Sequence, residues 1–236
     1  MTGHRKITEQ IDVFNMAAKI PISKLKAKGR GRTNFAVQHL MAAAYFSRKV
    51  HKIETINFGK EFGLFFDKIL WFSTACVFSS VASIESYFNE LFADSAENFP
   101  NYTDEIKIMM WGLIEKKSIL TKFNFALALR GAREFDKADS NFNNMLALIA
   151  LRNALIHFKP EWEDKQKNHL KISPLLKKKF APSTFILGNE GIFPRKWASH
   201  GCTVWAIESC LTFIEDFENR MKITAKFELF LQRLKT

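Results

Sequence analysis

The chain has 236 residues, 47% of them hydrophobic and 25% charged, which is an ordinary balance for a globular protein with one large core. Ten Gly and six Pro are few for this length, which argues against a sandwich built from many tight turns. The net charge of +11 favours a polyanionic partner, chiefly nucleic acid, and a basic surface without such a partner is the alternative.

Cysteine usage and the first residues indicate a cytoplasmic protein. Cys76, Cys202 and Cys210 have no C-x-x-C spacing and fit reduced thiols better than a disulfide framework. The N-terminal stretch has no apolar segment of the kind that a signal peptide carries. The longest uncharged run, residues 69–84, is shorter than the roughly 20 residues of a membrane helix. It predicts a buried core helix, and we expect no membrane span.

Residues 1–60 are expected to form an N-terminal helical extension with a basic arm. Residues 1–22 predict a short amphipathic helix that ends at Pro21. Glycines and like charges oppose regular structure in the next stretch, SKLKAKGRGRTN, which we interpret as a loop or arm. Its cations occupy every second position: Lys24, Lys26, Lys28, Arg30 and Arg32. A solvated linker and an arm that contacts phosphates are both consistent with this pattern.

Apolar spacing and cap residues predict five further helices before residue 160. The first four cover residues 35–53 with Thr33 or Asn34 as cap, 67–95, 103–117 with Thr103 as cap, and 118–130. The fifth, over residues 140–158, starts at Asp139 or Ser140 and ends before Pro160. The connection that follows residue 53 contains Gly59 and Gly63 and is expected to be less regular.

The helix over residues 140–158 carries apolar side chains all around it, which is typical of a buried helix. It nevertheless contains Arg152, Asn153 and His157, and a buried arginine requires a partner. Arg152 and His157 lie about 140° apart on the helix, whereas Asn153 and His157 share a face. A long arginine side chain can still reach back, so all three could line one groove that suits a phosphate. Alternatively, Arg152 pairs with a carboxylate such as Glu85, and His157 caps carbonyl groups.

Residues 159–200 are polar, rich in lysine and interrupted by prolines and glycines. They predict a long basic loop with a short hairpin near residues 183–193. Lys177, Lys178 and Lys179 are either a solvated run or a surface that helps to hold RNA. From Val204 the apolar spacing predicts a long amphipathic helix that reaches toward residue 233. The whole chain is therefore expected to be all-α.

Several stretches together resemble HEPN domains. Arg152 and His157, separated by four residues near the end of an apolar helix, are similar to the Arg-x(4–6)-His motif of that family. ASIESYFNELF, with Glu85 and Asn89 as supporting polar residues, resembles the family's first core helix. LRNALIHFKPEW, WGLIEKKSIL and SHGCTVWAIES resemble a bacterial HEPN-like subgroup. The resemblance covers roughly residues 69–230, and we assign residues 61–236 to the HEPN-like bundle.

The resemblance implies a bundle of about four core helices, often dimerised with two motif helices facing each other. It also implies a metal-independent endoribonuclease of toxin, defence or RNA-processing type, with no cofactor, an RNA substrate and an antitoxin-type protein as a possible partner. His157 would move the proton, Arg152 would stabilise charge on the phosphate, and Asn153 would orient the ligand. A non-catalytic HEPN-like module that binds nucleotides, RNA or proteins is the alternative.

Other patterns are weaker. Ser199, His200 and Cys202 precede the last predicted helix, where backbone amides could bind an anion or a Cys–His pair could act as a nucleophile. No three or four metal ligands occur at a suitable spacing, and no Walker or Rossmann glycine loop is present.

Overall fold

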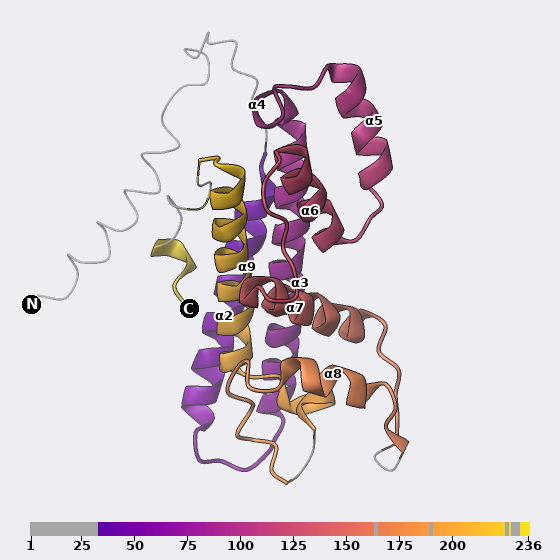
Figure 1. Cartoon of the computed structure of the whole chain (residues 1–236). Coiled ribbons are helices and arrows are strands. Elements are labelled where there is room, and N and C mark those ends of the chain that lie inside the picture. The colour runs from indigo at the N-terminus through magenta and orange to yellow at the C-terminus, as the bar shows by residue number, and fades with distance from the viewer. Residues whose placement is uncertain (1–32, 163–164, 189–190, 225–226, 228–231) are drawn as a thin grey trace, which may run out of the picture. The chain divides into compact units, whose positions relative to one another are not determined.

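Every regular element in the described part of the chain is a helix. The computed structural model describes residues 33–162, 165–188, 191–224, 227 and 232–236. Its elements are α2 (Phe35–Asn57), α3 (Phe65–Ala93), α4 (Ser95–Asn98), α5 (Asp104–Ile114), α6 (Ile119–Leu129), α7 (Ser140–Ile156), α8 (His169–Leu176), the short turn η3 (Ile192–Lys196) and α9 (His200–Met221) (Figure 1). The all-α prediction is confirmed for these residues. The predicted basic arm, Lys24 to Arg32, lies outside them.

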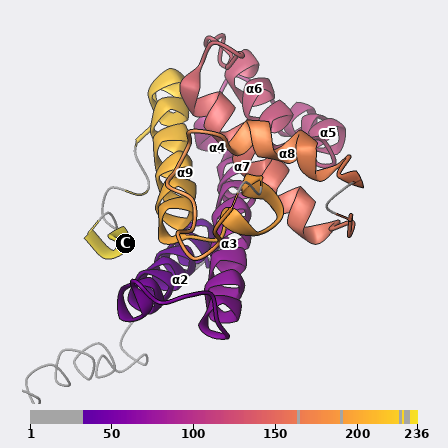
Figure 2. The same cartoon turned by 90° about the horizontal axis from the view of Figure 1, so that it is seen from below.

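Three long helices, α2, α3 and α9, pack along one another, and α7 crosses against α3 and α9 (Figures 1 and 2). Small polar side chains fix this close approach. Ser83 Oγ of α3 donates to the Ala36 carbonyl of α2 at 2.7 Å, and Ser47 of α2 shares a 2.8 Å hydrogen bond with Thr203 of α9. The compact unit runs from Asn34 to Thr236, so α2 belongs to it, although the sequence placed residues 1–60 in an extension.

Aromatic side chains fill the centre of the bundle. The Phe123 ring lies 4.7 Å from Phe217 and 5.0 Å from Phe213, measured between ring centroids. Beside it, the buried Tyr87 hydroxyl donates to the Glu218 carboxylate at 2.8 Å. Burial and the adjacent Glu218 charge raise the pKa of Tyr87. The abundance of phenylalanine in the sequence therefore corresponds to an aromatic core.

Helix α3 is the one described helix that is long and apolar enough to cross a membrane, judged by length and composition alone. It also lies at the centre of the packing and buries residues along its whole length, as core helices of soluble proteins do. The uncharged run 69–84 is thus a core helix, as predicted. The absence of a membrane span stays a prediction.

Among the predicted caps, Thr103 accepts a backbone N–H through its side chain, whereas Asn34 and Asp139 stand at cap positions without such a bond. The side chains of Thr103, Ser118 and Ser199 accept backbone N–H groups at the starts of α5, α6 and α9. At α2, Asn34 stands at the cap position without such a bond, and Glu90 of α3 accepts the Ala36 N–H at 2.9 Å instead. A carboxylate brought in by tertiary packing therefore replaces the local cap.

The region 159–200 differs from the prediction of a long loop with a hairpin. No strand occurs in its described residues, and helix α8 forms within it. Pro174, which looked like a helix breaker, lies inside α8 and removes one backbone donor there. Helix α9 ends at Met221, where Lys222 adopts a left-handed conformation, and not near residue 233.

Candidate functional site: the pocket between helices α7 and α8

Arg152 is held by an ion pair that ties α7 to α3. Its Nη2 donates to Glu85 Oε1 at 2.7 Å, and its Nη1 donates to Asn153 Oδ1 at 3.1 Å. The Arg152 side chain is 21% exposed and the Glu85 side chain 43% exposed, so the pair lies near the surface. The pairing with Glu85 matches one of the two sequence interpretations. Helix α7 itself is less buried than expected, because Leu146 and Ile156 face solvent.

Asn153 and His157 lie on a different side of α7 from Arg152. The backbone N–H of His157 donates to the Asn153 carbonyl at 2.9 Å and closes the last turn of the helix. The imidazole ring of His157 is exposed and has no hydrogen-bond partner among the described residues. The ring is therefore accessible to a ligand, while Arg152 reaches this side only through its bond to Asn153.

Asn153 and His157 line a pocket of about 360 Å³ between α7 and α8. Its apolar lining is Ala150, Ala154, Ile172 and Phe193, and its polar lining is Asn153, His157, Lys159, Asn168, His169 and Lys171. In both ribbon views α8 lies against α7 (Figures 1 and 2). An apolar floor beneath a basic rim can accept a flat ring together with an attached anion.

Glu161 fixes the start of α8, the helix that forms one side of this pocket. Its carboxylate accepts the backbone N–H groups of Lys167, Asn168 and His169 at 2.8–3.0 Å and so caps the first turn of α8. These bonds, above all that from His169, lower the pKa of Glu161 to about 2. Helix α7 ends at Ile156, and the glutamate of the following KPEW segment starts the next helix.

His169 is a pocket residue that the sequence interpretation missed. It is buried, it stacks on Phe158 with ring centroids 5.4 Å apart, and its Nε2 lies 3.0 Å from the Lys159 carbonyl. Because a carbonyl only accepts, Nε2 carries a proton. Nδ1 has no hydrogen-bond partner in the described part of the chain, and it lies 3.9 Å from Glu161 Oε2. A lone histidine in a lysine-rich stretch gave no signal of this placement.

The remaining predicted residues lie elsewhere. Asn89 lines a different groove, between α3 and α5. Lys177 and Lys178 follow α8 and are exposed. The Lys179 ammonium donates to Asn144 Oδ1 of α7 at 2.7 Å, so this lysine anchors the end of α8.

The Ser199–Cys202 stretch contains no free anion site and no nucleophilic pair. Ser199 caps α9, and His200 and Cys202 form its first turn instead of preceding it. Glu54 of α2 already accepts the His200 N–H at 2.9 Å, and the Ser199 side chain accepts that of Cys202. Burial raises the pKa of the Cys202 thiol, which disfavours the reactive thiolate.

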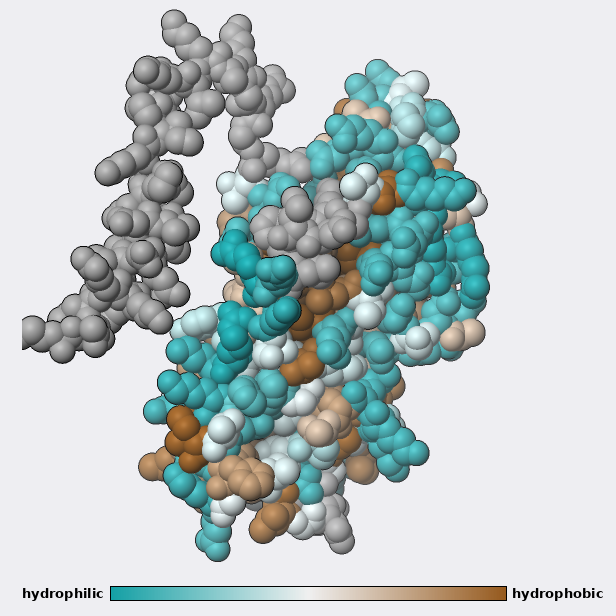
Figure 3. Space-filling view, turned by 90° about the vertical axis from the view of Figure 1, so that its left-hand side faces the viewer, coloured by the Kyte–Doolittle hydropathy of each residue, from teal (hydrophilic) through white to brown (hydrophobic). Residues whose placement is uncertain are grey.

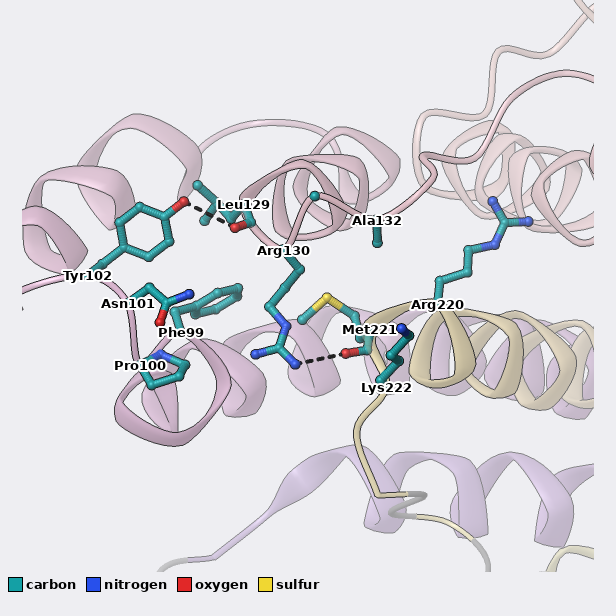
Figure 4. Close-up of a pocket in the computed structure, with 11 residues that line it drawn as sticks. Phe99, Pro100, Asn101, Tyr102, Leu129, Arg130, Ala132, Arg220, Met221 and Lys222 are labelled. Carbon is teal, nitrogen blue, oxygen red and sulfur yellow. Dashed lines mark hydrogen bonds between the residues drawn. The ribbon is translucent and has the colours of Figure 1, made fainter.

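Another pocket, of about 240 Å³, lies where α4, α6 and α9 end (Figure 4). Arg130 donates to the carbonyls of Asn98 and Met221, each at 3.1 Å, and Tyr102 donates to the Leu129 carbonyl. Helix C-termini carry partial negative charge, which a cation satisfies. Arg130 already supplies that cation, so we assign this pocket a structural role.

No protein-family model, curated protein or solved structure matches this chain. The HEPN resemblance therefore stays a prediction. Within the described residues, no group of three or more His, Cys, Asp or Glu side chains is arranged to hold a metal ion.

Proposed function

We propose that this protein is a metal-independent endoribonuclease of HEPN type that uses the pocket between α7 and α8. The observation that carries the proposal is the shared pocket of Asn153, His157, Lys159 and Lys171, with the His157 ring accessible. Imidazole is the side chain best suited to proton transfer near neutral pH. The lysines supply the positive charge that an RNA phosphate requires.

In the proposed reaction the 2′-hydroxyl oxygen of the RNA attacks the adjacent phosphorus, and the bond to the 5′-oxygen breaks. His157 accepts the proton of the attacking hydroxyl and delivers it to the departing 5′-oxygen. The products are a 2′,3′-cyclic phosphate and a 5′-hydroxyl. The two lysines at the rim stabilise the negative charge that develops on the phosphate.

Arg152 acts in this scheme as a positioning residue. Because it donates to the Asn153 side-chain oxygen, the Asn153 amide nitrogen is directed away from Arg152 and is available to a phosphate oxygen. Glu85 fixes the guanidinium in turn. This role differs from the direct phosphate contact that the resemblance implies.

A specific observation also favours a second candidate, a non-catalytic module that binds RNA or nucleotides. Glu85 neutralises Arg152 at 2.7 Å, so the arginine presents less free charge to a phosphate than a catalytic arginine needs. In that case the pocket binds its ligand without cleaving it.

The chemistry of the substrate distinguishes the nuclease from the non-catalytic binding module. The purified protein is first incubated with an RNA oligonucleotide, and the position of any cut is mapped. It is then incubated with the same sequence carrying a 2′-deoxy nucleotide on the 5′ side of that cut. We expect cleavage of the RNA to a 2′,3′-cyclic phosphate and no cut at the deoxy position, because the nucleophile is missing there. Equal cutting of both would reject the mechanism, and binding without cleavage of either would favour the module.

A further inference from the structure

Helix α5 has the reverse of the usual amphipathic pattern. Ile108, Met109 and Leu113 are 74%, 60% and 62% exposed, whereas the Lys107 side chain is only 11% exposed. A surface helix normally buries its apolar residues and leaves its lysines in water. Here Ile114 is the buried residue of the helix. An exposed apolar face of this kind marks an interaction surface.

The opposite side of α5 is the one that packs on the protein. The Trp111 ring lies 5.2 Å from Phe92 of α3, and Lys107 pairs with Asp104 at 3.2 Å. In Figure 1, α5 lies at the upper right edge, on the far side of α3 from α2 and α9. The hydropathy view displays the α2 and α9 side, where hydrophobic residues gather in a central seam and at the lower end (Figure 3). The α5 face is a separate surface.

At about 100° per residue, the outward face of α5 contains Glu105, Ile108, Met109 and Gly112, followed by Lys116 just after the helix. Gly112 has open space around its Cβ position. Gly112 is the third residue from the end of α5, and a glycine within an exposed helix weakens that helix relative to alanine, so it gains nothing for the isolated chain. It does leave a shallow site into which a side chain of another helix fits.

We propose that this face binds the α5 helix of a second copy of the chain in antiparallel orientation. Glu105 lies at the start of this face and Lys116 at its end, so an antiparallel pair brings these opposite charges together at both ends. With a two-fold axis between residues 110 and 111, Glu105 faces Lys116 of the second copy, and Met109 faces Gly112. A parallel pair would place like charges together.

This surface is distinct from the α7 face, at which the resemblance predicts a dimer. Helix α8 of the same chain already lies against Asn153 and His157, whereas no described residue covers the α5 face. One short helix face is small for an interface, so self-association in the micromolar range is expected. The exposed ion pairs set the orientation more than the affinity.

The first test is sedimentation velocity of the full chain over about 1–300 µM, a range suited to a small interface. We expect concentration-dependent dimers for the wild type and at least about tenfold weaker association for Met109→Glu. The matched control is Leu187→Glu, because Leu187 is also 80% exposed but lies far along the chain from α5. A monomer at all concentrations, or a dimer indifferent to Met109→Glu, would overturn the proposal.

The orientation is tested by exchanging charges. Glu105→Lys and Lys116→Glu each weaken self-association, because like charges then face each other at both ends. A mixture of the two variants forms a heterodimer in which both pairs are again attractive. Failure of the mixture to associate would refute the antiparallel arrangement. Circular dichroism checks that each variant keeps the wild-type helix content.

Discussion

Replacing Arg152 by Lys separates a positioning role from a simple need for positive charge. The guanidinium reaches Glu85 on α3 at 2.7 Å and Asn153 on α7 at 3.1 Å through two different nitrogens. A lysine ammonium is a single point charge and does not reproduce this fork. We expect Arg152→Lys to keep the pairing with Glu85 and to lose the hydrogen bond to Asn153.

The stability cost of Arg152→Lys should be small. A charge-assisted hydrogen bond contributes about 1.5–3 kcal/mol when buried, and the partial exposure of this pair reduces the loss to about 1 kcal/mol. For a domain of this size, such a loss lowers the melting temperature by about 2–4 °C. The rate of RNA cleavage should fall far more, by about tenfold or greater, because Asn153 is no longer oriented.

Thermal unfolding and single-turnover cleavage measure the two effects separately. Asn153→Ala should slow cleavage at least as much, because it also removes the amide that contacts the phosphate, and the double variant should be no slower than Asn153→Ala alone. Additive losses in the double variant would refute the positioning role. A wild-type cleavage rate for well-folded Arg152→Lys would refute it as well.

Three further predictions concern structure and stability. Since the pKa of Glu161 is depressed to about 2, its carboxylate stabilises the fold above its ordinary pKa of 4.5 and loses that effect as the pH falls toward 2. Glu161→Gln should therefore lower the unfolding midpoint more at about pH 6 than at about pH 3, as measured by urea titration, and an equal loss at both would contradict this. Arg130→Met should reduce the free energy of unfolding by about 2–4 kcal/mol in the same assay, because the carbonyls at Asn98 and Met221 lose a cationic donor, and an unchanged midpoint would show that water replaces it. Burial raises the pKa of Cys76 to about 12, so its thiol should react with a disulfide reagent only after unfolding, and rapid labelling of the folded protein would contradict its placement.

The helices of the bundle were predictable because their information is local. The cap Thr103 indicated the start of α5, apolar spacing indicated α6, and the uncharged run 69–84 lies in the core helix α3. The ion pair of Arg152 with Glu85 was one of two alternatives, because a buried arginine demands a carboxylate.

Features that depend on distant partners were not predictable. The start of α8 depends on Glu161, which lies eight residues before His169 in the sequence. The chain folds back between them, so that the Glu161 carboxylate accepts the His169 N–H. The His169 placement follows from that fold-back and has no motif of its own. Neither spacing nor composition indicated that the Glu54 carboxylate of α2 would accept the His200 N–H at the start of α9. Similarly, the all-round apolar pattern of α7 predicted burial, whereas its side with Leu146 is exposed.

The most direct test of the proposed function is the rate of RNA cleavage in EDTA by wild-type protein and by His157→Ala. We expect cleavage in EDTA by the wild type, and a loss of about 10²–10⁴ in rate for the variant, the usual contribution of general acid–base catalysis. His39→Ala, on α2, is the matched control and should cleave at the wild-type rate. Cleavage by folded His157→Ala at the wild-type rate, or loss of cleavage by the wild type in EDTA, would contradict the account.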